Sequence, residues 1–172
     1  MENQKILQPY LAGLKEELVY AVDHFVPGPA ELDVMLRYHL GWMDKEGRSI
    51  DTYAGKQIRP LLTLLSCQVV GEDWHNALPA AAAVELLHNF SLIHDDIEDN
   101  SPVRRGRPAL WCVWGIPLSI NAGDAMFALA HMALLRLSEV GVATERVLDC
   151  VRVFEQTNLT LTAGQHCDML FE

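Results

Sequence analysis

The longest apolar run of the chain, from Ala77 to Ile93, constrains the fold most, and it leads directly into a cluster of acidic residues. A proline and the polar residues Glu85 and His88 interrupt this run, so it predicts a buried helix and not a membrane span. We expect the helix, which is rich in alanine and leucine, to extend from Leu78 to about Asn100. The rest of the chain should be organised around it.

Helices are also predicted on both sides of this segment, because apolar residues recur at three- and four-residue spacing. The expected ranges are 6–25, 30–45, 117–140 and 144–172, with a shorter helix that ends at residue 70 and a polar loop over 46–53. No convincing strand, repeat or low-complexity segment is visible in the sequence. Helices that alternate with short loops predict an all-α bundle, and 172 residues suit a single domain.

The formal net charge of −10 argues against a nucleic-acid-binding protein, which would normally carry a basic stripe. It also makes local clusters of positive charge informative. Of the 13 lysines and arginines, five lie in two short clusters: Lys56 and Arg59, then Arg104, Arg105 and Arg107. An anionic ligand would need such a local basic site in an acidic protein.

The four cysteines lie in apolar segments and show no CxxC spacing, which is typical of buried, reduced thiols in a cytosolic protein. Met1 is followed by polar residues without an apolar core, so no signal peptide is visible. We therefore expect a cytoplasmic location. His166 and Cys167 do not predict a zinc site, because no second pair of ligands occurs at a suitable spacing.

Four acidic residues fall within five positions at the end of the central helix: Asp95, Asp96, Glu98 and Asp99. Residues four and seven apart share a helix face, so His88, Asp95 and Asp99 should lie along one stripe, with Asp96 rotated to its side. Two carboxylates at a helix C-terminus repel each other and oppose the helix dipole. Mg²⁺ would compensate them, since it binds one or two carboxylates together with water and phosphate oxygens.

The two basic clusters suit a polyphosphate beside such a cation. Lys56 and Arg59 stand at or just before a predicted helix N-terminus, whose free N–H groups favour anions. Three alternatives without a bound ligand remain at this point. The acidic cluster can be a solvated helix end, the bases can lie on a solvated loop, and Asp99 can form a structural salt bridge with Arg104 or Arg105. His94 faces away from the stripe and is expected to be structural.

Five motifs in order resemble those of the trans-isoprenyl diphosphate synthases, also called polyprenyl synthetases. The family patterns GGKRxRP, HxxSLIHDDxxD and RRGxP match Gly55 to Pro60, His88 to Asp99 and Arg104 to Pro108. Residues 122–127 are similar to its AGDxL helix, and residues 164–168 to its GQxxD motif. The resemblance covers nearly the whole chain and implies an all-α isoprenoid-synthase bundle.

The resemblance also implies a reaction. In the family, Mg²⁺ draws the diphosphate off an allylic substrate, and isopentenyl diphosphate attacks the resulting cation. The product is a longer trans-polyprenyl diphosphate, and metal ions take up the charge that develops on the leaving group. A homodimer is implied as well. The net charge and the interrupted apolar run already argue, independently of the resemblance, for no nucleic-acid partner and no transmembrane segment.

By position, the resemblance assigns Asp95 and Asp99 as Mg²⁺ ligands, with Asp96 in their support. It assigns Arg104 to the allylic diphosphate and Arg105 to isopentenyl diphosphate. The remaining substrate-binding residues that it implies are Lys56, Arg59 and His88 for isopentenyl diphosphate, and Gln165 and Asp168 on the allylic side.

Phe90 occupies a position where family members place an aromatic ring at the floor of the product tunnel, which implies a short-to-medium product. An ordinary core phenylalanine is the alternative. The chain departs from the family patterns at Ala54 and Gln57, which replace a glycine and an arginine, and at Trp111, which stands where a histidine is common.

A larger departure concerns the family's second aspartate-rich helix and a lysine, which lie well beyond the position of Asp168. No second DDxxD motif occurs in this sequence. We therefore expect residues 1–172 to be the N-terminal part of a synthase domain, with its C-terminal helices missing and its activity impaired. The alternatives are a non-catalytic partner of a full-length synthase and a terpene cyclase, although a cyclase would not need the second diphosphate site.

Overall fold

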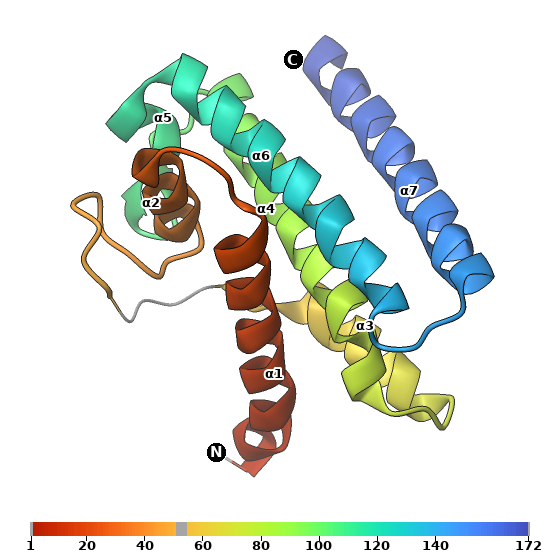
Figure 1. Cartoon of the computed structure of the whole chain (residues 1–172). Coiled ribbons are helices and arrows are strands. Elements are labelled where there is room, and N and C mark those ends of the chain that lie inside the picture. Colours follow the sequence, from red (N-terminus) through yellow and green to blue (C-terminus); the bar gives the residue numbers. More distant parts are fainter. Residues whose placement is uncertain (1, 51–54, 172) are drawn as a thin grey trace.

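The computed structural model describes residues 2–50 and 55–171 (Figure 1). The described residues form seven α-helices. They are α1 (Glu2–Phe25), α2 (Ala30–His39), α3 (Ile58–Val69), α4 (Leu78–Glu98), α5 (Leu110–Trp114), α6 (Ile116–Leu135) and α7 (Thr144–Phe171). Two 3₁₀ turns, η1 (Trp74–Ala77) and η2 (Arg136–Ser138), precede α4 and follow α6. The predicted all-α bundle is confirmed.

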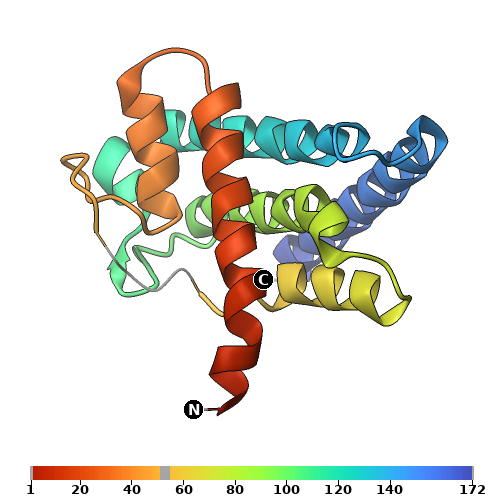
Figure 2. The ribbon, with the colours of Figure 1, turned by 60° about the horizontal axis from the view of Figure 1, so that its bottom comes forward.

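Helices α4 and α6 form the centre of the bundle and pack against each other along their lengths. Helix α1 crosses both of them, as Figure 2 shows, and α3 packs beside α4. Helix α7 contacts α6 and η2 (Figure 1). The predicted central helix, α4, is therefore one of the two elements around which the bundle is built, and α6 is the other.

Small side chains allow α4 and α6 to approach closely. A Cβ atom at Gly123 of α6 would lie 2.3 Å from His94 Nε2 of α4, so this crossing requires glycine. His94 packs there, as expected of a structural residue, with Nε2 3.3 Å from the carbonyl oxygen of Ile120. Six alanines of these two helices have no exposed surface: Ala81, Ala82, Ala83, Ala122, Ala130 and Ala133. Such close packing fills the core to a high density.

Helix α2 ends at His39, earlier than the predicted end at Lys45. Gly41 adopts a left-handed conformation with φ 80°, and its N–H donates to the Tyr38 carbonyl. The next N–H, of Trp42, donates to the Arg37 carbonyl at 2.8 Å, which closes the helix C-terminus. A glycine just past the last helical residue was the signal for this stop. The predicted 46–53 loop is described as far as residue 50, and the rest of it, like Ala54, lies outside the described residues.

The arginine loop is a small hairpin, where the sequence indicated no strand. Strand β1 (Val103–Arg104) pairs antiparallel with β2 (Arg107–Pro108). The two turn residues, Arg105 and Gly106, have φ angles of 52° and 75°, which a tight hairpin turn of this kind requires. Two-residue strands are too short to show an alternating pattern, so the sequence could not reveal them.

One helical segment, Ile116–Ser138, is long and apolar enough to cross a membrane by length and composition alone. It comprises α6 and η2, and α6 contacts α1, α2, α4 and α5. A core helix passes the same test, so the segment is weak support for a membrane span.

Candidate active site

The C-terminal end of α4 carries two carboxylates, Asp95 and Asp99, one helical turn apart. Asp95 is half-buried, and Asp99 is exposed at the helix C-cap, where its N–H donates to the Asp95 carbonyl. Among the described residues, neither carboxylate forms a direct ion pair. Burial raises the pKa of Asp95, and the nearby Glu98 and Asp99 raise it further, while Arg104 acts in the opposite direction. The negative charge at this helix end is therefore under-compensated.

Asp96 has a different environment from these two carboxylates. It is 1% exposed, and its Oδ1 accepts a hydrogen bond from Arg104 Nε at 2.9 Å. Its other oxygen is buried without a hydrogen-bond partner among the described residues. The alternative of a salt bridge between Asp99 and the arginine loop is not found among the described residues; the ion pair to Arg104 forms at Asp96 instead. A metal role for Asp96 stays a prediction, and from this position it would act from the side.

These carboxylates fit Mg²⁺ but do not form a complete metal cage. No group of three or more His, Cys, Asp or Glu side chains that could hold a metal is found within the described parts of the chain. Asp95 and Asp99 supply hard oxygen ligands one helical turn apart, and Mg²⁺ commonly takes one or two such carboxylates and fills its shell with water and phosphate. The donor set therefore matches a magnesium–diphosphate complex better than a site made of protein ligands alone.

A basic cavity of about 270 Å³ lies farther along α4, toward its N-terminus. It brings together four of the predicted substrate-binding residues from three parts of the chain: Lys56, Arg59, His88 and Arg105. Arg59 is the second residue of α3, and Lys56 lies two residues before its first residue, as the sequence indicated. His88 lies on α4, and Arg105 reaches the cavity from the hairpin tip. The cavity is therefore the part of the predicted site that the described residues assemble most fully.

His88 is electrically neutral in this cavity at pH 7. Burial lowers its pKa to about 4, and Arg59, Arg105 and Arg104 contribute in the same direction. Its Nε2 lies 3.4 Å from Arg59 Nη1. Because a guanidinium can only donate, Nε2 has to accept, which leaves the N–H on Nδ1.

Gly55 permits Arg105 to approach the start of the α3 segment. Gly55 has φ 89°, and a Cβ atom at this position would lie 3.3 Å from Arg105 Nε. A side chain would be strained by its backbone conformation and would also press on the guanidinium. The backbone conformation of Gly55 and its closeness to Arg105 therefore explain why a glycine stands at this position of the first motif.

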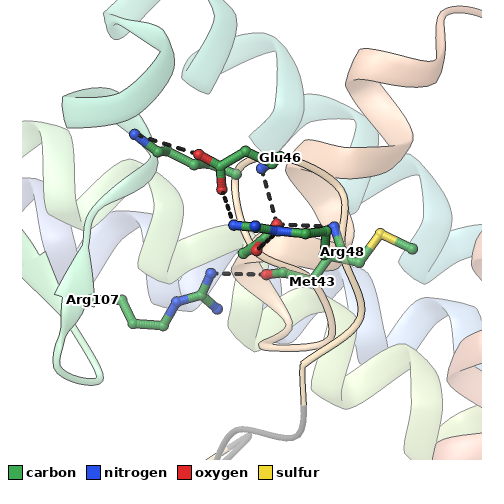
Figure 3. Close-up of polar contacts among 6 residues, drawn as sticks. Met43, Glu46, Arg48 and Arg107 are labelled. Carbon is green, nitrogen blue, oxygen red and sulfur yellow. Dashed lines mark hydrogen bonds and ion pairs between the residues drawn. The ribbon is translucent and has the colours of Figure 1, made fainter.

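The third arginine of the loop, Arg107, has a structural role in the described residues. Its Nη1 donates to the Tyr38 carbonyl at 3.1 Å and its Nη2 to the Met43 carbonyl at 2.8 Å. Figure 3 shows Arg107 reaching toward the loop that holds Met43, Glu46 and Arg48. The guanidinium also lies 3.8 Å from the centre of the Tyr38 ring. Arg107 thus ties the hairpin to the end of α2.

Trp111, which stands where a histidine is common, forms a hydrogen bond of its own. Its indole Nε1 donates to the Ser101 carbonyl at 2.9 Å, which joins α5 to the segment before the hairpin. An indole N–H supplies the donor that a histidine ring would offer. Trp111 therefore has a structural role in this chain.

A larger cavity of about 830 Å³ separates α4 from α7. Arg59, His88 and Asp95 stand at its polar side, and the rest of its wall is mostly apolar, including Leu87 and Phe154. His88 and Asp95 of the predicted stripe therefore face one space. The size and the apolar wall suit a hydrocarbon chain whose charged end lies near α4.

Gln165 and Asp168 lie on the last turns of α7 and border an open groove of about 630 Å³. Gln165 Nε2 donates to Glu98 Oε2 at 3.1 Å, which brings α7 to the acidic end of α4. Asp168 is exposed in the groove. The structure thus places Gln165 beside the acidic end, and Asp168 outside both cavities described above.

Phe90 lies in a separate cavity of about 320 Å³ between α4, α6 and α7. Its ring centre lies 5.0 Å from that of Phe127 and 4.8 Å from that of His94. This packing suits an ordinary core residue as well as a tunnel floor. The chain-length role of Phe90 stays a prediction.

Sequence reasoning missed two polar residues of the site, Glu85 and Asn89. They lie on α4 beside the basic cavity and are 3% and 0% exposed. From the sequence, Glu85 was considered only because it interrupts the apolar run. Two polar residues one helical turn apart in such a run were a signal for a buried polar site.

Three comparisons place this geometry among known proteins. The polyprenyl synthetase family model matches residues 42–172. The chain is 45% identical over 172 residues to the short chain isoprenyl diphosphate synthase of Methanothermobacter thermautotrophicus, covering 100% of this chain and 48% of that protein. It is 41% identical over 138 residues to the (2E,6E)-farnesyl diphosphate synthase of Mycobacterium tuberculosis, covering 80% of this chain and 37% of that protein.

Solved structures give the same picture. The geranylgeranyl pyrophosphate synthetase of the archaeon Geoglobus acetivorans matches with a TM-score of 0.81 and 33% identity, over 97% of this chain and 49% of that chain. The polyprenyl synthetase of Streptomyces coelicolor matches with a TM-score of 0.73 and 38% identity, over 95% of this chain and 48% of that chain. The chain spans about half, or less, of the length of the relatives that it matches.

Proposed function

The chain belongs to the polyprenyl synthetase family, and from this premise we propose that it carries the substrate-binding half of an isoprenyl diphosphate synthase. The reaction condenses isopentenyl diphosphate with an allylic diphosphate to give a longer trans-polyprenyl diphosphate of short to medium length. The observation that carries the proposal is the basic cavity, where Lys56, Arg59, His88 and Arg105 meet. Relatives named farnesyl and geranylgeranyl diphosphate synthases support the short product.

The basic cavity is proposed to hold the diphosphate of isopentenyl diphosphate. The guanidinium groups of Arg59 and Arg105 offer several donors in a planar arrangement that matches phosphate oxygens. Lys56 adds a positive charge at the start of α3. Neutral His88 can donate from Nδ1 to an oxygen without a further proton, while its Nε2 remains tied to Arg59.

The allylic diphosphate is proposed to bind at the acidic end of α4. Asp95 and Asp99 would hold Mg²⁺ there, and the metal would supply positive charge against the leaving diphosphate. Arg104 stands beside them, held by Asp96, and adds a fixed positive charge. The apolar wall of the 830 Å³ cavity would take up the hydrocarbon chain and exclude water from the reacting carbons.

Two alternatives are less well supported. A terpene cyclase ionises one diphosphate and condenses nothing, so it would not need the basic cavity as a second diphosphate site. A non-catalytic partner subunit is consistent with the exposed apolar side chains along α7, among them Val153, Leu159 and Leu170. It gives no reason, however, for the basic cavity and the two carboxylates at the end of α4, unpaired within the described residues, to occur together.

We further propose that the native enzyme is a cytoplasmic homodimer without a nucleic-acid partner. The family resemblance supports the dimer. The cysteines were expected to be buried thiols, and this is wrong: Cys67 is only partly buried, and Cys112, Cys150 and Cys167 are exposed, because they lie on outer helix faces. All four are free thiols, which agrees with a reducing compartment. Analytical ultracentrifugation of the purified chain would test the dimer, and fractionation of the source cells would test the location.

The direct test incubates the chain with Mg²⁺, labelled isopentenyl diphosphate and dimethylallyl, geranyl or farnesyl diphosphate. Mass spectrometry would identify the products, and Asp95→Asn would serve as the inactive control. A product longer by one isoprene unit is the expected result and also reports the chain length. If calorimetry detected no binding of isopentenyl diphosphate and no product formed, the proposal would be overturned.

A further inference from the structure

Glu85 and Asn89 form a buried polar pair on α4, one helical turn apart. Asn89 Nδ2 donates to the Glu85 carbonyl at 2.8 Å and to Glu85 Oε1 at 3.1 Å. Both side chains are almost completely buried, in a helix otherwise rich in alanine and leucine. Buried polar groups are costly unless they are hydrogen-bonded, so a pair at this place calls for a reason beyond helix formation.

The pair fixes the orientation of the Asn89 amide. An asparagine amide has a donating and an accepting end, and its hydrogen-bond partners decide which end points where. Both acceptors near Nδ2 belong to Glu85, so Nδ2 must face Glu85. The oxygen Oδ1 is then turned toward Arg105, whose Nη2 donates to it at 3.2 Å.

Arg105 depends on such contacts because its own backbone gives it little support. It stands in the two-residue turn of a hairpin with two-residue strands, and its φ of 52° is unusual for a residue with a side chain. Its Nη1 makes a longer contact of 3.4 Å with the His39 carbonyl. The bond to Asn89 is thus the shorter of these two contacts, and it comes from the rigid central helix.

We propose that Glu85 and Asn89 are positioning residues, which hold the Arg105 guanidinium in the basic cavity and so set the affinity for isopentenyl diphosphate. This inference rests on the proposed function of that cavity. Glu85 acts by orienting the amide, and Asn89 acts by holding the guanidinium. The carboxylate of Glu85 also offsets part of the repulsion between Arg59 and Arg105. Burial raises the pKa of Glu85, and the two arginines act in the opposite direction, with a smaller effect.

A purely structural role makes a different prediction from a positioning role. If the pair only satisfies its own hydrogen bonds, replacing both members by apolar residues of similar size should leave the site intact. The test therefore uses the double variant Glu85→Met/Asn89→Leu, the single variant Asn89→Leu, and Ser119→Ala as a matched change of a fully buried polar residue on α6.

The first readout is the Nε–H signal of Arg105 in the NMR spectrum of the substrate-free chain, assigned by its loss in Arg105→Lys. We expect both Asn89 variants to shift this signal and to speed its exchange with water, while Ser119→Ala leaves it unchanged. A folded double variant with an unchanged Arg105 signal would overturn the inference. This readout needs no substrate, so it decides the inference even if the proposed function fails.

The second readout is the dissociation constant of isopentenyl diphosphate, measured by calorimetry. We expect about a tenfold weaker affinity in both Asn89 variants, the size of effect typical for a hydrogen bond to a charged group. In the Arg105→Lys background the same changes should cause no further loss. Independent, additive losses would contradict positioning through Arg105. Absence of binding by the unaltered chain would instead count against the proposed function.

Discussion

The basic cavity and the acidic end of α4 lie on the same helix but differ in how they are supported. In the basic cavity, Arg105 is held by Asn89, and Arg59 lies against His88. At the acidic end, Asp95 faces the 830 Å³ cavity, Asp99 is exposed, and neither forms a direct ion pair among the described residues. In the basic cavity, other side chains of this chain hold the positive charges in place. At the acidic end, the negative charges of Asp95 and Asp99 have no such partner in the described parts of the chain and favour a bound cation.

Under the proposed function, this difference predicts that the two diphosphates are handled differently. A substrate that is only bound and positioned profits from donors that are fixed beforehand, because less order is lost on binding. A leaving diphosphate needs charge compensation that increases as the bond breaks, which a metal ion supplies. We therefore expect changes at the acidic end to affect turnover, and changes at the basic cavity to affect affinity.

The largest expected effect is that of Asp95→Asn on turnover. Loss of this carboxylate should lower product formation about a hundredfold or more, as is typical when a group that stabilises developing charge is removed. The affinity for isopentenyl diphosphate should stay within about twofold, because the basic cavity is untouched. Kinetics and calorimetry on the same preparation would measure both, with Asp23→Asn on α1 as a surface control. Equal losses in turnover and affinity would contradict the division between the regions.

The second prediction concerns stability at the acidic end. Asp96→Asn removes the buried partner of Arg104 and should lower the free energy of unfolding by about 2 kcal/mol, a value reduced because Arg104 is partly exposed. Asp99→Asn should leave stability unchanged or raise it by about 0.5 kcal/mol, since it relieves repulsion at a helix C-terminus. Urea unfolding would measure both. Similar losses in the two variants would show that these carboxylates are not in different environments.

The third prediction separates two arginines of the same hairpin. Arg105→Lys should weaken binding of isopentenyl diphosphate about tenfold, because lysine cannot reproduce the fixed guanidinium geometry. Arg107→Lys should lower stability, because it loses contacts with Tyr38 and Met43, while affinity changes less. Calorimetry and thermal unfolding would be run on both variants. If Arg107→Lys weakened binding as strongly as Arg105→Lys, the structural role of Arg107 would be wrong.

The sequence predicted the helices and the motif residues well, because both depend on local patterns. The spacing of apolar residues indicated α1, α3, α4 and α7 nearly to their ends. The basic cavity was also indicated, since Lys56, Arg59, His88 and Arg105 all belong to the motifs. The spacing of apolar residues thus predicts most of the helices, and the motifs predict most of the site residues.

The hydrogen-bond partners of the three loop arginines could not be predicted from the sequence. Arg104, Arg105 and Arg107 are near neighbours in the chain, yet they contact Asp96, Asn89 and the end of α2 respectively. These partners depend on the hairpin turn, whose two-residue strands carry no pattern. The early end of α2 and the role of Trp111 depend likewise on single backbone and side-chain contacts.

The last prediction concerns acidification, which should act on the two regions with opposite sign. The folded state holds the pKa of His88 at about 4, below its ordinary value of 6.5. Between these values the unfolded chain binds a proton that the folded chain does not, so His88 makes unfolding easier as the pH falls. Because the ring is partly exposed, solvent screening reduces this loss to about 1 kcal/mol.

Asp95 should behave in the reverse way, since its pKa is raised in the folded state. Its contribution to stability is present at low pH and is lost as the pH rises through its folded pKa. His88→Gln should therefore flatten the loss of stability between pH 6.5 and about 4, whereas Asp95→Asn should steepen it at the acid end of that range. Urea unfolding at several pH values would measure both slopes, with the exposed His24→Gln as the control. The same change of slope in both variants would mean that the two ends of α4 do not differ in charge compensation.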